Sequence, residues 1–140
     1  EIIKHEQALS NNYQIACSVK GIGMLTSLYL LVYTGNFTKF SSAKKLGSYC
    51  GVVPFGYSSG TSIRGKTKIH PMANKQLKTA LHMCAMSAII QEGEMRKYYR
   101  RKVEEGKNKM SVINAVRNKL LQRVFACVRD QQMYSYNQTA

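Results

Sequence analysis

The chain has 140 residues, of which 44% are hydrophobic, and this suits one domain with a modest core. With 21 Lys and Arg against 7 Asp and Glu, its formal net charge of +14 favours a polyanionic partner, most simply nucleic acid, with an acidic membrane surface as the weaker alternative. No apolar run is long enough to span a membrane and the 4 cysteines form no CxxC pair, which argues against a membrane protein and against a zinc site.

The first helix is predicted over residues 2–17, where the pattern is amphipathic. The chain begins abruptly inside this pattern and shows no signal peptide, so we expect a piece of a longer cytoplasmic protein in which residues 1–17 end a helical linker. After a glycine turn, an apolar helix is predicted from about Met24 to Tyr33. Gly35 should end it, because glycine readily takes the left-handed conformation that follows many helices.

A short helix is predicted next, with Ser41 or Ser42 as its N-cap, and it should reach about Cys50. Residues 52–70 lack helical periodicity and contain Pro54 and several glycines. They are therefore predicted to form a long ordered loop or a small hairpin.

A long helix is predicted from Pro71, because apolar residues follow at the spacing of a buried stripe until Gly93 breaks it. The stripe consists of Leu77, Ala80, Leu81, Cys84, Ala85, Ala88 and Ile89.

Two more helices complete the pattern, a charged one that Gly106 stops and a last one over about 109–131. The apolar face of the last helix consists of Ile113, Val116, Leu120, Val124, Cys127 and Val128. The predicted fold class is therefore all-α or nearly so, with one helical domain over 18–131 and a frayed tail over 132–140.

The segment VKGIGMLTS contains a glycine turn, with Gly21 and Gly23 on either side of Ile22 and Lys20 just before it. This is the spacing of the turn in a helix-hairpin-helix, where backbone amides at a helix N-terminus approach a phosphate closely. The alternative is a plain connection between two helices. The net charge favours the phosphate-binding turn.

Basic residues gather in the last two predicted helices, with aromatic residues among them. They are Arg96, Lys97, Arg100, Arg101, Lys102, Arg117, Lys119, Arg123 and Arg129, with Tyr98 and Tyr99 inside the first cluster. Cations can hold phosphates while aromatic rings stack on unpaired bases. For a single residue, a solvated face partly balanced by Glu94, Glu104 and Glu105 is the simpler interpretation, but for the whole set a nucleic-acid face is favoured.

Between Glu6 and Glu92 the chain has no Asp or Glu. Sites that transfer phosphoryl groups with two metal ions need carboxylates to hold those ions. If this chain acts chemically on nucleic acid, its nucleophile is therefore a side chain, or its metal site lies on another domain or chain.

The segment VVPFGYSSGTSIRGKTKIHP places Ser58 and Ser59 beside Gly60. A serine hydroxyl is a poor nucleophile unless one group takes its proton and another stabilises the charge that its attack creates. Glycine next to the serine gives the backbone freedom to present the hydroxyl outward.

Basic residues that follow the serines can meet both needs. Arg64, Lys66 and Lys68 can clamp a phosphodiester, and His70 or His82 can take or shuttle a proton. The alternative is a phosphate-binding loop with no covalent chemistry, and composition alone favours that alternative.

Several segments occur in a specific order: the GIG turn, TGNFTKFSSAKKLGSYCG at 34–51, Pro54, SSG at 58–60 with cations after it, and ANKQLKTALHMCAMSAI at 73–89. In this order they resemble the C-terminal domain of the insertion-sequence one-ten family of transposases, the bridge-RNA-guided DNA recombinases of bacterial mobile elements. The resemblance covers most of residues 18–91, and later residues match only in general character. One departure is Ala73, where the family often has glycine, and it bears on the start of the next helix.

The resemblance implies a helix-hairpin-helix-containing helical domain whose long loop carries the SSG motif, and it maps the family's DNA-linking serine nucleophile onto Ser59. It also implies an N-terminal RNase-H-like domain whose acidic residues hold a divalent metal, with Mg²⁺ expected, while this part of the protein needs no cofactor. DNA, a structured guide RNA and further copies of the protein are the implied partners, at the bacterial chromosome.

We therefore expect catalysis from Ser59, Arg64 and Lys66. The expected nucleic-acid contacts are Lys20, Gly21, Gly23, Ser58, Gly60, Ser62, Lys68, Lys75, Arg100 and Arg101. The alternative function is a non-catalytic helix-hairpin-helix module that only binds nucleic acid.

Overall fold

The computed structural model describes residues 2–52 and 74–135, and this part of the chain forms helices and no strand. In chain order the helices are α1 (Ile2–Ser18), α2 (Met24–Tyr33), α3 (Ala43–Tyr49), α4 (Lys75–Ile90), α5 (Glu94–Glu104) and α6 (Lys109–Asp130). The all-α prediction is confirmed. The loop or hairpin predicted for residues 52–70 lies, beyond Val52, outside the described residues.

Polar side chains begin three of the helices. Ser42 Oγ accepts from the backbone N of Lys45 at 3.2 Å, and Asn108 Oδ1 accepts from that of Ser111 at 3.2 Å. Such caps satisfy amides that have no partner inside the helix. Of the two serines predicted as the N-cap of α3, Ser42 is the one that caps the helix.

The start of α4 differs from the prediction. Asn74 has an extended backbone, with φ −79° and ψ 107°, and its Oδ1 accepts from the backbone N of Leu77 at 3.0 Å. The helix therefore begins at Lys75 rather than at Pro71. The Asn74 side chain is its N-cap, because it accepts the hydrogen bond of an amide that has no partner inside the helix.

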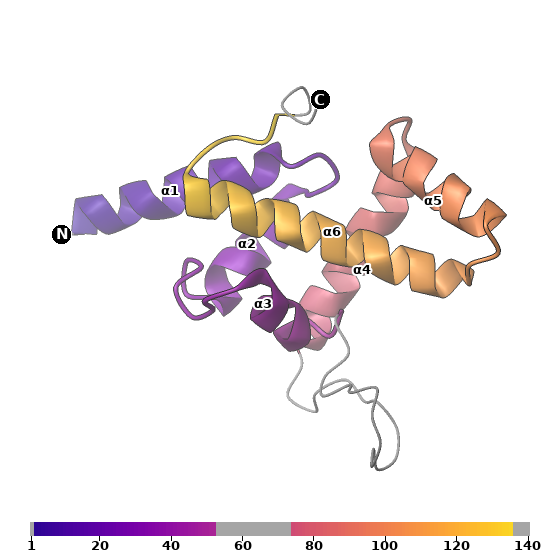
Figure 1. The fold of residues 1–140 in the computed structure, drawn as a ribbon. Coiled ribbons are helices and arrows are strands. Elements are labelled where there is room, and N and C mark those ends of the chain that lie inside the picture. Colours follow the sequence, from indigo (N-terminus) through magenta and orange to yellow (C-terminus); the bar gives the residue numbers. More distant parts are fainter. Residues whose placement is uncertain (1, 53–73, 136–140) are drawn as a thin grey trace, which may run out of the picture.

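The C-terminal end of α6 is tied to α1, which changes the interpretation of the tail. Gln131 takes the left-handed conformation at φ 52°, and its Nε2 donates to Asn12 Oδ1 at 2.9 Å. The backbone N of Tyr134 donates to Ser18 Oγ at 2.8 Å, and the chain runs back over α1 in Figure 1. The tail predicted to fray from residue 132 is thus held at Tyr134, while residues 136–140 lie outside the described ranges.

The core forms around α6, which crosses the molecule and packs against α1, α3, α4 and α5 (Figure 1). Its fully buried leucines are Leu30, Leu46, Leu77, Leu81, Leu120 and Leu121. Ile15 and Ala16 of α1 are also buried, so the C-terminal half of α1 packs into this core.

The four cysteines are free thiols, of which Cys50 and Cys84 are buried and Cys17 and Cys127 are half-buried. Burial raises the pKa of the Cys50 thiol to about 12, so it stays neutral and unreactive at physiological pH. None of the helices that the structure describes is long and apolar enough to cross a bilayer.

Candidate nucleic-acid interface

The two glycines of the turn between α1 and α2 have different roles. Gly21 has φ +100°, and a Cβ there would lie 3.3 Å from Cβ of Ala88 and 3.5 Å from the Leu120 side chain. Gly23 is exposed, has an extended backbone before α2, and a Cβ there would meet nothing within 4 Å. Gly21 is therefore required by packing, whereas Gly23 has room for a side chain, and no side chain caps the first amides of α2.

Replacing Gly23 by valine should leave the fold intact and lower DNA affinity by about fivefold, because the branched side chain would stand between a phosphate and the open amides. The measurement is a fluorescence binding titration beside a thermal melt. Ser10→Val, at an exposed position on α1, is the matched control and should bind as the wild type does. Unchanged affinity in Gly23→Val would show that the turn is only a connector.

Lys20 does not extend freely from this turn. Its Nζ donates to the backbone oxygen of Glu92 at 3.0 Å, at the junction between α4 and α5. The residue is exposed, so an anion can still approach it, but one of its donors already stabilises the packing of the turn.

Tyr98 of α5 lies at the centre of a cationic cluster. Lys119 Nζ is 4.7 Å from the ring centroid, the Arg101 guanidinium carbon is 5.6 Å away and Lys102 Nζ is 6.0 Å away. The negative face of an aromatic ring attracts such cations and so holds them close together despite their repulsion. Tyr98 and Tyr99 are both partly buried against the core, so their rings are only partly open to a base.

The outer face of α5 carries cations that no described carboxylate neutralises. Within the described ranges the ion pairs are Arg123 with Glu94 at 2.6 Å, Lys102 with Glu105 at 3.3 Å, and Arg129 with Asp130 at 2.9 Å. Arg100 and Arg101 are exposed and belong to none of them, and Arg100 lines a hollow of about 460 Å³ together with Glu92, Arg96 and Lys97. This face can attract a phosphate backbone.

The residues that flank the segment with the predicted nucleophile are hydrogen-bonded to α3 and α6. The backbone N of Val52 donates to the oxygen of Gly47 at 3.0 Å, and the Val52 oxygen accepts from Asn114 Nδ2 of α6 at 3.0 Å. At the other end, the backbone N of Asn74 donates to the Tyr49 oxygen at 2.7 Å. The two described ends are thus both fixed at the C-terminal end of α3.

All three predicted catalytic residues, Ser59, Arg64 and Lys66, belong to the segment outside the described residues. Ser58, Ser59, Gly60, Ser62, Arg64, Lys66, Lys68 and His70 lie outside the described residues. Lys75 is exposed at the first position of α4, and His82 is half-buried further along the same helix.

Arg117 differs from its predicted place on the basic face. It is 7% exposed, and its Nε is enclosed with no hydrogen-bond partner. Burial lowers the pKa of its guanidinium. The pattern of α6 could have signalled this position, since Arg117 follows Val116 and lies three and four residues from the core residues Leu120 and Leu121 and four from Ile113.

Among the residues that the structure describes, no three His, Cys, Asp or Glu side chains gather in a way that could hold a metal ion. The acidic residues of α5 are engaged or exposed singly, and the stretch from residue 7 to residue 91 has none. The described donor set therefore does not fit a divalent cation.

Comparison with known proteins matches residues 13–100 to the model of a family described as "Transposase IS116/IS110/IS902 family". The chain is 32% identical over 137 residues to the "Pilin gene-inverting protein" of Moraxella bovis, and similarly to that of Moraxella lacunata. It is 33% identical over 120 residues to the "Insertion element IS110 uncharacterized 43.6 kDa protein" of Streptomyces coelicolor.

The alignments cover most of this chain but less than half of each relative. The Moraxella bovis alignment spans 96% of this chain but 42% of that protein, and the Streptomyces coelicolor alignment spans 86% and 29%. The similarity thus extends over α5 and α6, where the sequence motifs matched the family only in general character. The chain spans less than half the length of these relatives.

Proposed function

The chain belongs to the IS116/IS110/IS902 transposase family, and from this premise we propose that it is the DNA-binding and catalytic-serine part of a recombinase that moves an insertion element. Two relatives are named for inverting a pilin gene. A gene inversion breaks and rejoins DNA, which is the chemistry that a serine nucleophile would perform here.

The family match over residues 13–100 is the observation that carries this proposal, because a transposase has to break and rejoin DNA. The described residues on either side of the segment are hydrogen-bonded to the helices, Val52 to Gly47 and Asn114 and Asn74 to Tyr49. In the proposed step, Oγ of Ser59 gives its proton to a base and bonds to phosphorus. The bond from phosphorus to a deoxyribose oxygen breaks, and that oxygen takes up a proton.

The resulting phosphoserine ester keeps the energy of the phosphodiester bond, so a second DNA hydroxyl can displace Ser59 without ATP. Arg64 and Lys66 would stabilise the charge of the pentavalent transition state. Losing either should therefore lower the rate more than the affinity. Ser58 and Ser62 would position the DNA.

Other parts of the proposal concern the longer protein. A divalent metal, if one is used, would be held by acidic residues beyond this chain, because the described residues offer no cluster that fits it. A structured guide RNA, assembly of several copies and action at the bacterial chromosome are proposed on the resemblance stated above. Exposed Lys75, Arg100 and Arg101, with the turn at Gly23, would hold nucleic-acid backbone.

If the chain binds DNA as proposed, its DNA affinity should depend steeply on salt concentration. Neutralising about four to eight phosphates would give a slope of about −4 to −7 in a plot of log affinity against log salt concentration. The measurement is DNA binding by the chain between low and physiological salt. Arg100→Gln should make the slope shallower by about one unit, because each lost phosphate contact releases one counterion fewer. A flat plot for the wild type would contradict DNA binding driven by charge.

A non-catalytic module that only grips DNA is the rival function, and the open amides in front of α2 favour it, because they need no serine chemistry. The two functions differ in one product. The full-length protein with its RNA should leave protein covalently joined to cleaved DNA on a denaturing gel if the serine attacks, and should leave none if the module only binds.

A further inference from the structure

Arg117 is the one charged side chain that is buried within residues 2–52 and 74–135. No described residue accepts a hydrogen bond from its guanidinium or forms an ion pair with it, and its Nε is fully enclosed. A largely buried cation that has no partner among the described residues costs free energy, and an anion that binds it would recover part of that cost.

The carboxylates of α5 lie on another side of α6. Lys119 contacts Tyr98 and Arg123 pairs with Glu94, so these two positions mark the side of α6 that faces α5. A helix turns by about 100° per residue, which places Arg117 about 200° around the axis from Lys119 and about 120° from Arg123. No acid of α5 can therefore neutralise it.

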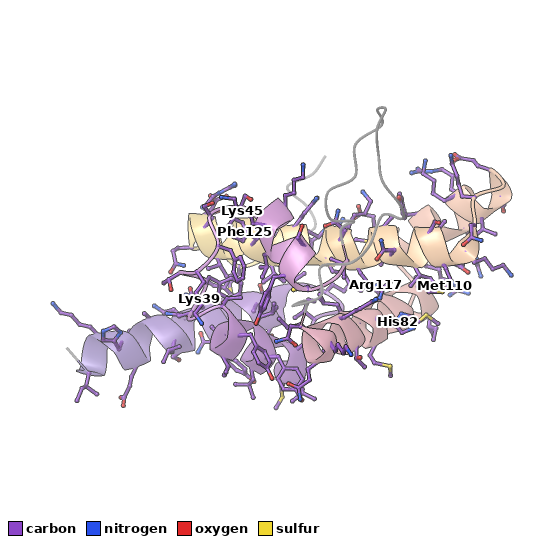
Figure 2. The ribbon with its side chains drawn as sticks, turned by 90° about the horizontal axis from the view of Figure 1, so that it is seen from below. Lys39, Lys45, His82, Met110, Arg117 and Phe125 are labelled. Carbon is purple, nitrogen blue, oxygen red and sulfur yellow. The ribbon has the colours of Figure 1, made fainter. Side chains whose placement is uncertain are left out.

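Arg117 shares its side of α6 with Asn114, one turn earlier, whose Nδ2 holds the Val52 oxygen at 3.0 Å. Figure 2 shows Arg117 where α6 passes α4, the helix that begins with the exposed Lys75. The helices α2, α3 and α4 supply no carboxylate to this side, since residues 7–91 contain no Asp or Glu. An anion for Arg117 must come from outside this part of the chain.

We propose that Arg117 is a phosphate-binding residue that takes a DNA phosphodiester at the side of α6 that carries Asn114. The proposal rests on the function proposed above, which supplies the anion. A planar guanidinium can bind two phosphate oxygens with paired hydrogen bonds, and such charge-assisted bonds are stronger than those between neutral groups. The lowered pKa of the guanidinium is consistent with a cation that is poorly solvated before the phosphate binds.

The test compares Arg117→Met with Lys4→Met, which removes one positive charge from an exposed position on α1. Arg117→Met should lower DNA affinity by more than about tenfold, as expected for lost charge-assisted hydrogen bonds, while Lys4→Met should lower it by less than about twofold. Without DNA, Arg117→Met should melt at the same temperature or higher, because an apolar side chain replaces an unpaired charge. Arg117→Lys keeps the charge but not the planar fork and should fall between the two.

Inorganic pyrophosphate is the probe that tests this proposal separately from the proposed function. It should raise the melting temperature of the wild type and of Lys4→Met more than that of Arg117→Met. DNA affinity unchanged in Arg117→Met would overturn the proposal even if the wild type binds DNA, and would indicate a carboxylate partner elsewhere in the longer protein. Loss of folding in both Arg117 variants would also overturn it, because the guanidinium would then stabilise the free fold. A wild type without salt-dependent DNA binding would instead contradict the proposed function.

Discussion

Replacing Gly21 by valine should lower the free energy of unfolding by about 3 kcal/mol or more, enough to unfold much of a small domain. The backbone at φ +100° is one that residues with a branched Cβ rarely adopt. The new Cβ would also lie 3.3 Å from Cβ of Ala88, and the methyl groups beyond it would be forced into the contact between α4 and α6. Urea denaturation followed by circular dichroism measures the loss.

Gly23→Val is the matched control for this effect. It adds the same side chain two residues later, at a position where a Cβ meets nothing within 4 Å and the backbone is extended. It should cost less than about 1 kcal/mol, which is the scale of exchanging glycine for a poor N-cap residue. Equal losses in the two variants would contradict the division of roles between the glycines.

Ser59→Ala should abolish the covalent protein–DNA species that the full-length protein forms with its RNA and DNA. Without the hydroxyl no phosphoserine bond can form, so the loss should be at least about a thousandfold, the scale seen when a nucleophile is removed. DNA affinity should stay within about twofold, because a single exposed hydroxyl contributes little to binding. A denaturing gel of labelled DNA measures the adduct, and a native titration measures the affinity.

Ser58→Ala is the control for position within the SSG motif. It should reduce the adduct without removing it, because Ser58 is expected to position the DNA rather than to attack it. An undiminished adduct in Ser59→Ala would assign the nucleophile elsewhere, with Ser58 next in line. Loss of DNA binding in Ser59→Ala would point to a binding role for this serine.

Much of the fold could be predicted because it follows from local patterns. The stripe of α4 and the apolar face of α6 have the helical period, and Gly35 and Gly106 follow the ends of helices with positive φ. The start of α4 was misplaced because a proline and an asparagine both signal a helix start, and only the structure shows that Asn74 is the cap. The contact of Tyr134 with Ser18 joins residues far apart in sequence, which no local pattern reveals.

The site could be predicted less well, because net charge does not show which cations are exposed. Arg117 and Lys119 are two positions apart in the sequence, yet Arg117 is buried with no partner among the described residues and Lys119 lies over the Tyr98 ring. Lys20 is expected to face a phosphate and is exposed, and its Nζ also donates to the backbone oxygen of Glu92, a contact between residues 72 positions apart. Such differences depend on tertiary packing, which decides the solvation of each charge.

The identity of the residue joined to DNA tests the central claim most directly. The trapped adduct of the full-length protein can be digested with protease and nuclease, and the modified peptide sequenced by mass spectrometry. We expect a nucleotide phosphate on Oγ of Ser59. A nucleotide on a residue outside 53–73, or none on any residue of this chain, would contradict the account.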